Sequence, residues 1–433
     1  MGLLLSAYRL AAGLAFPLIR GRLLKSHRTG FDERCGAYDQ AKLDGIAGRK
    51  TLWLHAVSVG EVQAAAPFAR EAASGWDGAI VMSTVTETGE ASARSLVGDL
   101  IEFHAYAPWD IPRIVRAACD ALHPSAYVTA ETEVWPNLLT ELRGRGVPTV
   151  LLNARLSDRT WNRAGIARGA LREAYGLFDL ILARGEEDGR RFEVLGADPG
   201  AIHVTGDCKV DAIIQRREAA SEKIPALLEK LSRGFSGRAS FFVAGSTHEG
   251  EDEAVIAAFR EFRREAPPAG SMLIVAPRHP ERAEAVAAMA GSQFRVAMFS
   301  SLTNRDSPEP PDIVIVDEIG ALYDLYGVAD AAFVGGSLVP KGGQNILEPA
   351  SWGTPILHGP HMEDFAAPTA ELDSLGAAHE VKCASEIASL WRKAALGELR
   401  PSAAAGRDYL ASRSGAARRS WELVLPLLGK TND

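Results

Sequence analysis

A glutamate at position 61 is placed where a buried strand gives way to a helix. The run HAVSVGE, residues 55–61, follows the apolar segment 51–54 and precedes an Ala-rich segment. Gly60 permits a tight turn between the two elements. Because open α/β sheets place ligands and catalytic groups where their strands end, the Glu61 carboxylate is a candidate general base. The alternative is that Glu61 only complements the helix dipole in a first turn.

Other polar groups follow further apolar segments of the first half. Glu131 and Glu133 come directly after segment 126–130, in the run AETEVWPN. Carboxylates at a strand end are costly to bury without partners, which favours a functional site there. Lys209, in the run GDCK, can neutralise an anion, although an isolated lysine is more often at the surface. The hydroxyl-rich run STVTETG, residues 83–89, suits either anion binding or plain helix capping.

The second half carries three polar runs at predicted strand ends. They are GSTHEG at 245–250, PRHPER at 277–282 and a glycine-rich stretch at 335–349. Arg278 can donate two hydrogen bonds at once to a phosphate, and a glycine-rich loop brings backbone donors close to one. Asn345 and Glu348 also have the spacing of a helix capping box, which is a structural role. Three such runs in one half indicate a nucleotide-binding site.

Several classes of chemistry are not predicted. The net charge is −8 over 433 residues, which argues against a nucleic-acid partner. The chain has no P-loop, no Asp-x-Asp pair and no GxSxG elbow. Its histidines lack metal-ligand spacing, so we expect neither a metal nor a cofactor. The four cysteines lie far apart in the sequence, which is typical of a reducing, cytoplasmic compartment.

The elements that must position these groups alternate between apolar strands and helical patterns. This alternation predicts parallel sheets covered by helices, an α/β fold. We expect two Rossmann-like domains facing a central cleft, with the crossing in the polar stretch after 212. The expected division is 1–30, 31–211 and 212–433. The predicted strands are 52–57, 79–84, 101–106, 126–130, 149–153, 180–183 and 202–205, then 241–244, 272–276, 294–298, 313–316, 331–334 and 355–357.

The N-terminus departs from this pattern. Residues 2–19 are apolar apart from Ser6, Tyr8 and Arg9, and a basic cluster follows at 20–28. Positive charge after the apolar run is typical of an anchor whose globular body stays in the cytoplasm, not of a secretory signal. About 20 apolar residues are needed to span a bilayer, and Arg9 interrupts this run. A helix lying in the membrane interface and a helix packed on the protein itself are the alternatives.

Taken in order, the motifs resemble those of the 3-deoxy-D-manno-octulosonic acid (Kdo) transferases of lipopolysaccharide synthesis. The resemblance covers nearly the whole chain and includes the N-terminal anchor. It rests on the runs HAVSVGE, STVTETGE, AETEVWPNLL, LLNARLSDR, EEDGRRFEVLGA, VTGDCKVD, GSTHEGEDE, PRHPER and LYGVADAAFVGGSLVPKGGQNILEPASWGTPILHGPH.

The resemblance implies a GT-B glycosyltransferase that transfers Kdo, with inversion, from CMP-Kdo to a lipid A precursor (lipid IVA). It places the enzyme at the cytoplasmic side of the cell inner membrane, with residues 1–30 as the membrane anchor. Residues 31–211 then form the acceptor domain, and residues 212–433 the CMP-sugar domain. By motif, Glu61 is the general base, and Glu131 and Lys209 stabilise the transition state. The implied CMP site comprises Pro277, Arg278, Ile319, Gly320, Ala321, Asn345, Ile346, Leu347 and Glu348.

One departure from the family pattern concerns Ala321, where some relatives have a glutamate, so that loop is expected to contribute through its backbone. Two other functions stay open from the sequence. One is a different GT-B nucleotide-sugar transferase or epimerase, which a preference for CMP over UDP would exclude. The other is a non-catalytic nucleotide- or lipid-binding protein of the same fold, which turnover of CMP-Kdo would exclude.

Overall fold

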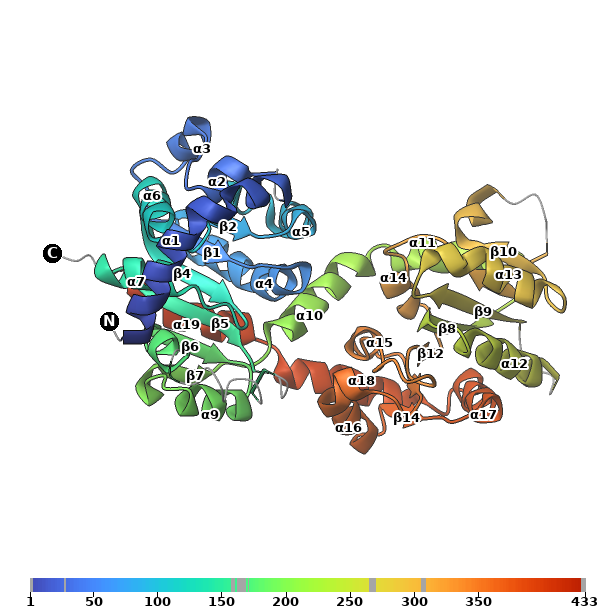
Figure 1. Ribbon diagram of the computed structural model, residues 1–433. Helices are drawn as coiled ribbons and strands as arrows, with labels where there is room; N and C mark the ends of the chain where they lie inside the picture. The colour runs from blue at the N-terminus through green and yellow to red at the C-terminus, as the bar shows by residue number, and fades with distance from the viewer. Residues whose placement is uncertain are drawn as a thin grey trace. The chain divides into compact units, whose positions relative to one another are not determined.

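The chain folds into two compact units, each built on a parallel seven-stranded sheet (Figure 1). The structure is a computed structural model that describes residues 3–26, 29–156, 160, 161, 169, 171–264, 270–304 and 309–429. The first unit contains residues 1–212 and 413–433, and the second contains residues 213–412. The helix α10 (Cys208–Ser221) begins in the first unit and ends in the second.

The first sheet has the strand order β3-β2-β1-β4-β5-β6-β7, which contains the Rossmann order. Its strands are β1 (Thr51–His55), β2 (Ala79–Thr84), β3 (Phe103–Tyr106), β4 (Pro124–Ala130), β5 (Thr149–Ala154), β6 (Leu180–Ala183) and β7 (Ile202–Val204). The helices that follow these strands are α4 (Val59–Gly75), α5 (Glu87–Val97), α6 (Pro112–Leu122), α7 (Pro136–Gly144) and α9 (Glu186–Val194).

The strand β1 shows why such strands are continuous apolar runs. Leu52 and Leu54 pack into the core on one face of the sheet, and Trp53 packs into the core on the other. Successive side chains of a strand point to opposite faces, and helices cover both faces of a parallel sheet. All five residues of β1 are therefore buried. Polar side chains that reach solvent lie instead in the residues that follow its carboxyl end.

The C-terminal helix α19 (Ala416–Leu428) belongs to the first unit. Trp421 meets Phe68 of α4 edge-on, with ring centroids 5.7 Å apart. The Asp211 carboxylate accepts the backbone N–H groups of Gly415 at 2.6 Å and Ala417 at 2.7 Å. The expected domain 212–433 therefore differs from the observed units, because residues 413–433 return to the first unit and complete its core.

The second sheet has the order β10-β11-β9-β8-β12-β13-β14. Its strands are β8 (Ala239–Thr247), β9 (Gly270–Pro277), β10 (Val296–Met298), β11 (Ile313–Ile315), β12 (Ala331–Val334), β13 (Ile356–His358) and β14 (Ala378–Glu380). The helices of this unit are α11 (Ile224–Ser232), α12 (Glu251–Arg264), α13 (Ala283–Gly291), α14 (Leu322–Tyr326), α15 (Leu347–Trp352), α16 (Ala366–Ser374), α17 (Ala384–Ala395) and α18 (Arg400–Arg413).

The N-terminal helix α1 (Leu3–Ser26) lies against α6 and α7 of the first unit. Phe16 is 2% exposed, and its ring lies 5.7 Å from that of Trp109. Leu10, Leu14 and Leu18 are 66%, 68% and 84% exposed. Among the described residues, no helix is long and apolar enough to cross a membrane. The helix therefore has one face packed on the protein and one apolar face in solvent.

Candidate active site

Glu61 lies in the first turn of α4, directly after the carboxyl end of β1. One oxygen of its carboxylate accepts the backbone N–H of Val57 at 2.8 Å, and the other accepts the Ser58 hydroxyl at 3.1 Å. Burial raises the pKa of Glu61, and the negative charge of Glu131 raises it further, while these hydrogen bonds and Lys209 lower it. The side chain is thus held in place and made more basic than a free glutamate.

Glu131 follows β4 and anchors an ion-pair network. Its carboxylate receives Lys209 Nζ at 2.6 Å on one oxygen and Arg155 Nε at 3.1 Å on the other. The backbone of Glu131 has a left-handed conformation with φ of +59°, which non-glycine residues adopt only when their surroundings impose it. Only 8% of Glu131 is exposed, so the two cations supply the compensation that a buried carboxylate requires.

Glu133, two residues further on, adds a third carboxyl group. Burial raises its pKa to about 7, helped by the negative charges of Glu61 and Glu131. A carboxyl with a pKa near 7 holds a proton for part of the time at neutral pH. Perturbed carboxyl groups of this kind cluster at functional sites, which marks this end of the first sheet as a candidate reaction centre.

Three buried side chains with polar atoms, Trp53, His55 and Ser83, lie in the strands β1 and β2 next to this centre. The Ser83 hydroxyl accepts Trp53 Nε1 at 2.8 Å and lies 2.9 Å from His55 Nδ1. Burial lowers the pKa of His55 to about 4, so its imidazole is neutral. In the same run, the Thr86 hydroxyl caps α5 by accepting the Gly89 N–H at 3.0 Å. Ser83 and Thr86 therefore have structural partners.

In the second unit, Pro277 ends β9 and Arg278 follows it. The Arg278 N–H donates to the Thr247 carbonyl at 2.9 Å, which ties the ends of β9 and β8 together. The Arg278 side chain is exposed, and no ion pair or hydrogen bond involves its guanidinium within the described part of the chain. Its five donors are therefore available to a ligand.

The loop of Ile319, Gly320 and Ala321 precedes the short helix α14. Gly320 has φ of +100°, a conformation that glycine adopts without strain. Ile319 is 90% exposed, which is unusual for a large apolar side chain beside candidate ligand groups. Because Gly320 has no side chain, a ligand can approach the backbone of this loop there. The neighbouring Ile319 side chain lies in solvent.

Residues 345–348 form the start of α15. Asn345 Oδ1 accepts the Leu347 N–H at 3.2 Å, so Asn345 does cap the helix. Ile346 is buried. The Glu348 side chain is 24% exposed and makes a long ion pair with Arg216, at 3.4 Å between NH1 and Oε1. The Glu348 carboxylate thus has Arg216 and the Asn345 side chain as its polar neighbours.

The glycine-rich loop that begins at Gly335 is not a phosphate cradle. The backbone N–H groups of Gly336, Ser337 and Leu338 all donate to the Glu251 carboxylate, at 2.7, 2.9 and 2.9 Å. The His248 N–H donates to the same group at 2.9 Å. Because Glu251 is fully buried, an internal carboxylate occupies the place expected for a ligand anion, and the loop has a structural role.

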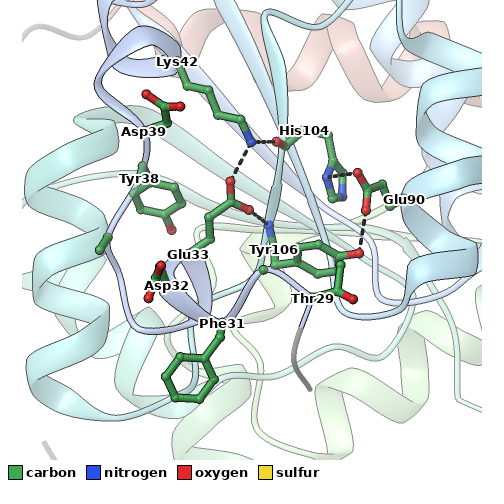
Figure 2. A pocket seen from close by; sticks show the side chains of 12 residues that line it. Thr29, Phe31, Asp32, Glu33, Tyr38, Asp39, Lys42, Glu90, His104 and Tyr106 are labelled. Atoms are coloured by element: carbon green, nitrogen blue, oxygen red, sulfur yellow. Dashed lines mark hydrogen bonds and ion pairs between the residues drawn. The ribbon is translucent and has the colours of Figure 1, made fainter. Parts of the chain in front are cut away.

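A hollow of about 620 Å³ opens elsewhere in the first unit, beside β3 and the segment 29–42 (Figure 2). Lys42 Nζ lies 2.6 Å from Glu33, whose other oxygen accepts the Tyr106 N–H at 2.8 Å. The Tyr106 hydroxyl donates to Glu90 at 2.5 Å. These lining groups are paired with one another (Figure 2), and none of the predicted site residues lines the hollow.

The structure thus gathers Glu61, Glu131 and Lys209 in the first unit. In the second unit it places residues 277 and 278 at the end of β9, residues 319–321 directly before α14, and residues 345–348 at the start of α15. Glu133, which the sequence had marked beside Glu131 without a role, joins the first group, and so does Arg155, which the sequence reasoning missed. Both lie within motifs that mark the family resemblance, and their charge beside a strand end was the available signal. Among the described residues, no group of three or more His, Cys, Asp or Glu side chains is arranged to hold a metal.

Comparisons with known proteins agree with the motifs. A sequence model of the family described as 3-deoxy-D-manno-octulosonic-acid transferase (kdotransferase) matches residues 29–212. A 3-deoxy-D-manno-octulosonic acid transferase of Haemophilus influenzae is 32% identical, over 93% of this chain and 92% of that protein. A protein of the same name from Bordetella pertussis is 34% identical, over 87% of each chain.

A solved structure, the UDP-GlcNAc 2-epimerase of Neisseria meningitidis, resembles the fold. The likeness covers 88% of this chain and 100% of that one, with a TM-score of 0.58 and 12% identity. At this identity the likeness concerns the fold alone. Together with the two Rossmann-like sheets, it confirms the GT-B architecture predicted from the sequence.

Proposed function

The chain belongs to the 3-deoxy-D-manno-octulosonic acid transferase family, and from this premise we propose that it moves Kdo from CMP-Kdo to a hydroxyl group of a lipid A precursor. Members of this family are glycosyltransferases. The observation that carries the proposal is the cluster of Glu61, Glu131 and Lys209 at one sheet edge. Unlike Glu251, whose carboxylate is satisfied by backbone N–H groups, Glu131 pairs with the charged side chains of Lys209 and Arg155, and such charged clusters with perturbed carboxyl groups are typical of functional sites.

Glu61 acts as the general base in this reaction. The acceptor hydroxyl oxygen attacks the anomeric carbon of Kdo, and its proton passes to the Glu61 carboxylate. The bond between that carbon and the CMP phosphate oxygen breaks, and CMP leaves with the electron pair. Each Glu61 oxygen has lone pairs beyond those used by Val57 and Ser58, so both the hydrogen bonds that hold the base and the one to substrate can form. A sugar hydroxyl has a very high pKa, so proton removal must be concerted with departure of CMP.

Lys209 and Arg155 supply positive charge at the reaction centre. Both pair with Glu131, which fixes their positions before substrate arrives. Preorganised charges stabilise a transition state because they need no rearrangement during the reaction. Glu131 acts in this scheme by orienting the two cations, and Lys209 offsets negative charge that develops as CMP departs.

Donor binding falls to the second unit. Among the described residues the Arg278 guanidinium has no partner, and its fork suits the CMP phosphate. Pro277 sets the Arg278 backbone at the end of β9. The backbone of 319–321 and the start of α15 at 345–347 offer further contacts to the nucleotide. The Glu348 carboxylate accepts hydrogen bonds from the ribose hydroxyls.

The helix α1 holds the enzyme at the cytoplasmic face of the inner membrane, where its lipid acceptor resides. Leu10, Leu14 and Leu18 recur every four residues, so they share one face of the helix, and all three are exposed. The basic residues Arg20 and Lys25 follow in the last turns and favour an anionic membrane surface. Together with the packed opposite face, this supports a helix that lies in the interface rather than one that spans it.

The proposal is tested by incubating the full-length protein with CMP-Kdo and a lipid A precursor in detergent. We expect mass spectrometry to show an acceptor heavier by one or more Kdo residues and an equivalent release of CMP. UDP-GlcNAc offered as donor in a parallel reaction should give no product. Transfer from UDP-GlcNAc, or no transfer from CMP-Kdo by a folded protein, would reject the assignment. The number of added residues is read from the same spectrum.

A further inference from the structure

We infer that Arg216 is a positioning residue of the nucleotide site, which holds the Glu348 carboxylate in the orientation that accepts hydrogen bonds from the ribose. The inference rests on the proposed placement of CMP at residues 345–348. Arg216 lies outside every motif used above. It lies in the C-terminal half of α10, in the second unit. Glu348, on α15, belongs to the same unit.

Arg216 is held by an aromatic ring. Its guanidinium carbon lies 3.9 Å from the centroid of the Tyr323 ring, a distance typical of cation–π stacking. Its NH1 group lies 3.4 Å from Glu348 Oε1. The stacking restricts the plane of the guanidinium, so the direction from which Glu348 is approached is restricted as well.

Tyr323 is itself locked in place. It is 1% exposed, and its hydroxyl lies 2.9 Å from the carbonyl oxygen of Ile213 and 3.0 Å from Ser351 Oγ. The Ser351 hydroxyl in turn lies 2.7 Å from the Glu348 carbonyl. This chain of contacts joins α10, α14 and α15, so the helix that carries Arg216 is fixed against the helix that carries Glu348.

The charge of Arg216 also matters to Glu348. Burial raises the pKa of the Glu348 carboxyl, and the Arg216 charge and a hydrogen bond from Asn345 lower it. Without Arg216 the pKa would rise further, and the carboxyl would take up a proton at a higher pH. A protonated carboxyl loses part of its capacity to accept hydrogen bonds from two ribose hydroxyls.

The helix α10 carries cations in both units. Lys209, in its first turn, pairs with Glu131, and Arg216, seven residues later, pairs with Glu348. A substitution at Arg216 should therefore affect recognition of the nucleotide and not the chemical step.

The experiment compares calorimetric binding of CMP and of 2′,3′-dideoxy-CMP to the full-length protein. The variants are Arg216→Gln, Arg216→Lys and Glu348→Gln, with Arg260→Gln as the control. The exposed Arg260 pairs with Gln293 on another part of the unit. Melting temperatures establish that each variant is folded. In Arg216→Gln we expect CMP binding to weaken about tenfold or more while dideoxy-CMP binding changes less than about twofold.

Arg216→Lys should restore part of the preference for CMP, since it keeps the charge and loses the planar fork. As the pH is lowered, the preference for CMP over dideoxy-CMP should disappear in both proteins. In Arg216→Gln it should disappear at a higher pH than in the wild type. Equal weakening of both ligands, or no change, would overturn the inference and leave Arg216 a structural residue. If Glu348→Gln leaves the preference for CMP intact, the proposed nucleotide site itself is wrong, and the inference falls with it. If Glu348→Gln abolishes the preference while Arg216→Gln does not, only the inference fails.

Discussion

Replacing Lys209 by methionine removes the cation closest to Glu131 while keeping a similar apolar stem. The Lys209 ammonium lies 2.6 Å from Glu131 Oε1, in a group that also contains Glu61, Glu133 and Arg155. With all three carboxyl groups ionised, three negative charges face two positive ones. The substitution leaves a single positive charge, that of Arg155. We expect the remaining carboxyl groups to bind protons more tightly and the developing charge on the leaving group to lose its stabilisation.

The magnitude follows from the burial of the pair. The Lys209 side chain is 32% exposed and that of Glu131 is 10% exposed. Breaking a buried, hydrogen-bonded charge pair costs about 2–5 kcal/mol. Because Arg155 still pairs with Glu131 in the variant, we expect the free energy of unfolding to fall by the lower end of this range, about 2 kcal/mol. Loss of one preorganised electrostatic donor commonly lowers kcat by about 10²–10³-fold. We therefore expect kcat for Kdo transfer to fall by about 100-fold or more in a protein that still folds.

The pH profile gives a sharper test, because Lys209 lowers the pKa of Glu61. Without Lys209 that pKa rises, and the ionised base is lost at a higher pH as the pH falls. The acid limb of the kcat/KM profile should therefore move to higher pH.

The assay is release of CMP from CMP-Kdo with detergent-dispersed acceptor, measured between about pH 5 and 9. Lys382→Met is the matched control, because that lysine is 72% exposed and pairs only weakly with Glu380. A Lys209→Met enzyme with near wild-type kcat would refute the electrostatic role. A large loss of rate with an unmoved acid limb would refute the proposed coupling between Lys209 and Glu61.

Three further outcomes are expected. Glu61→Gln keeps the shape of the base and removes its basicity, so transfer should slow by about 100- to 10,000-fold with little change in CMP binding; a near wild-type rate in a folded protein would reject the base. Arg278→Ala should weaken CMP binding about tenfold or more in calorimetry, without lowering the melting temperature because the side chain is exposed; unchanged affinity would place the phosphate elsewhere. Leu14→Gln combined with Leu18→Gln should shift the protein from the membrane to the soluble fraction, since each buried leucine contributes about 1.5–3 kcal/mol; equal membrane retention of this variant and of the exposed-leucine control Leu396→Gln would contradict an interfacial α1.

Local patterns predicted most of the secondary structure. The strands β2, β6 and β12 have the predicted bounds, because each is a short apolar run that helices cover on both faces. β14 was not predicted, since Ala378–Glu380 has no apolar run, and it exists because its backbone pairs with β13. The helix α19 was assigned to the second half by its place in the sequence, whereas its contacts with α4 place it in the first unit.

The sequence by itself determined which residues stand at strand ends, because strand and helix periods are local properties and a strand-to-helix turn exposes whatever follows it. Glu61, Glu131, Lys209 and Arg278 were found in this way. Only the tertiary structure decided which of these groups meet. The sheet order brings Lys209 to Glu131 across 78 positions of sequence, as the difference of their numbers gives, and adds Arg155 to them. The fold also decided that Glu251 takes the N–H groups of the glycine-rich loop, because hydrogen bonds between distant segments depend on how the strands are ordered and not on either segment alone.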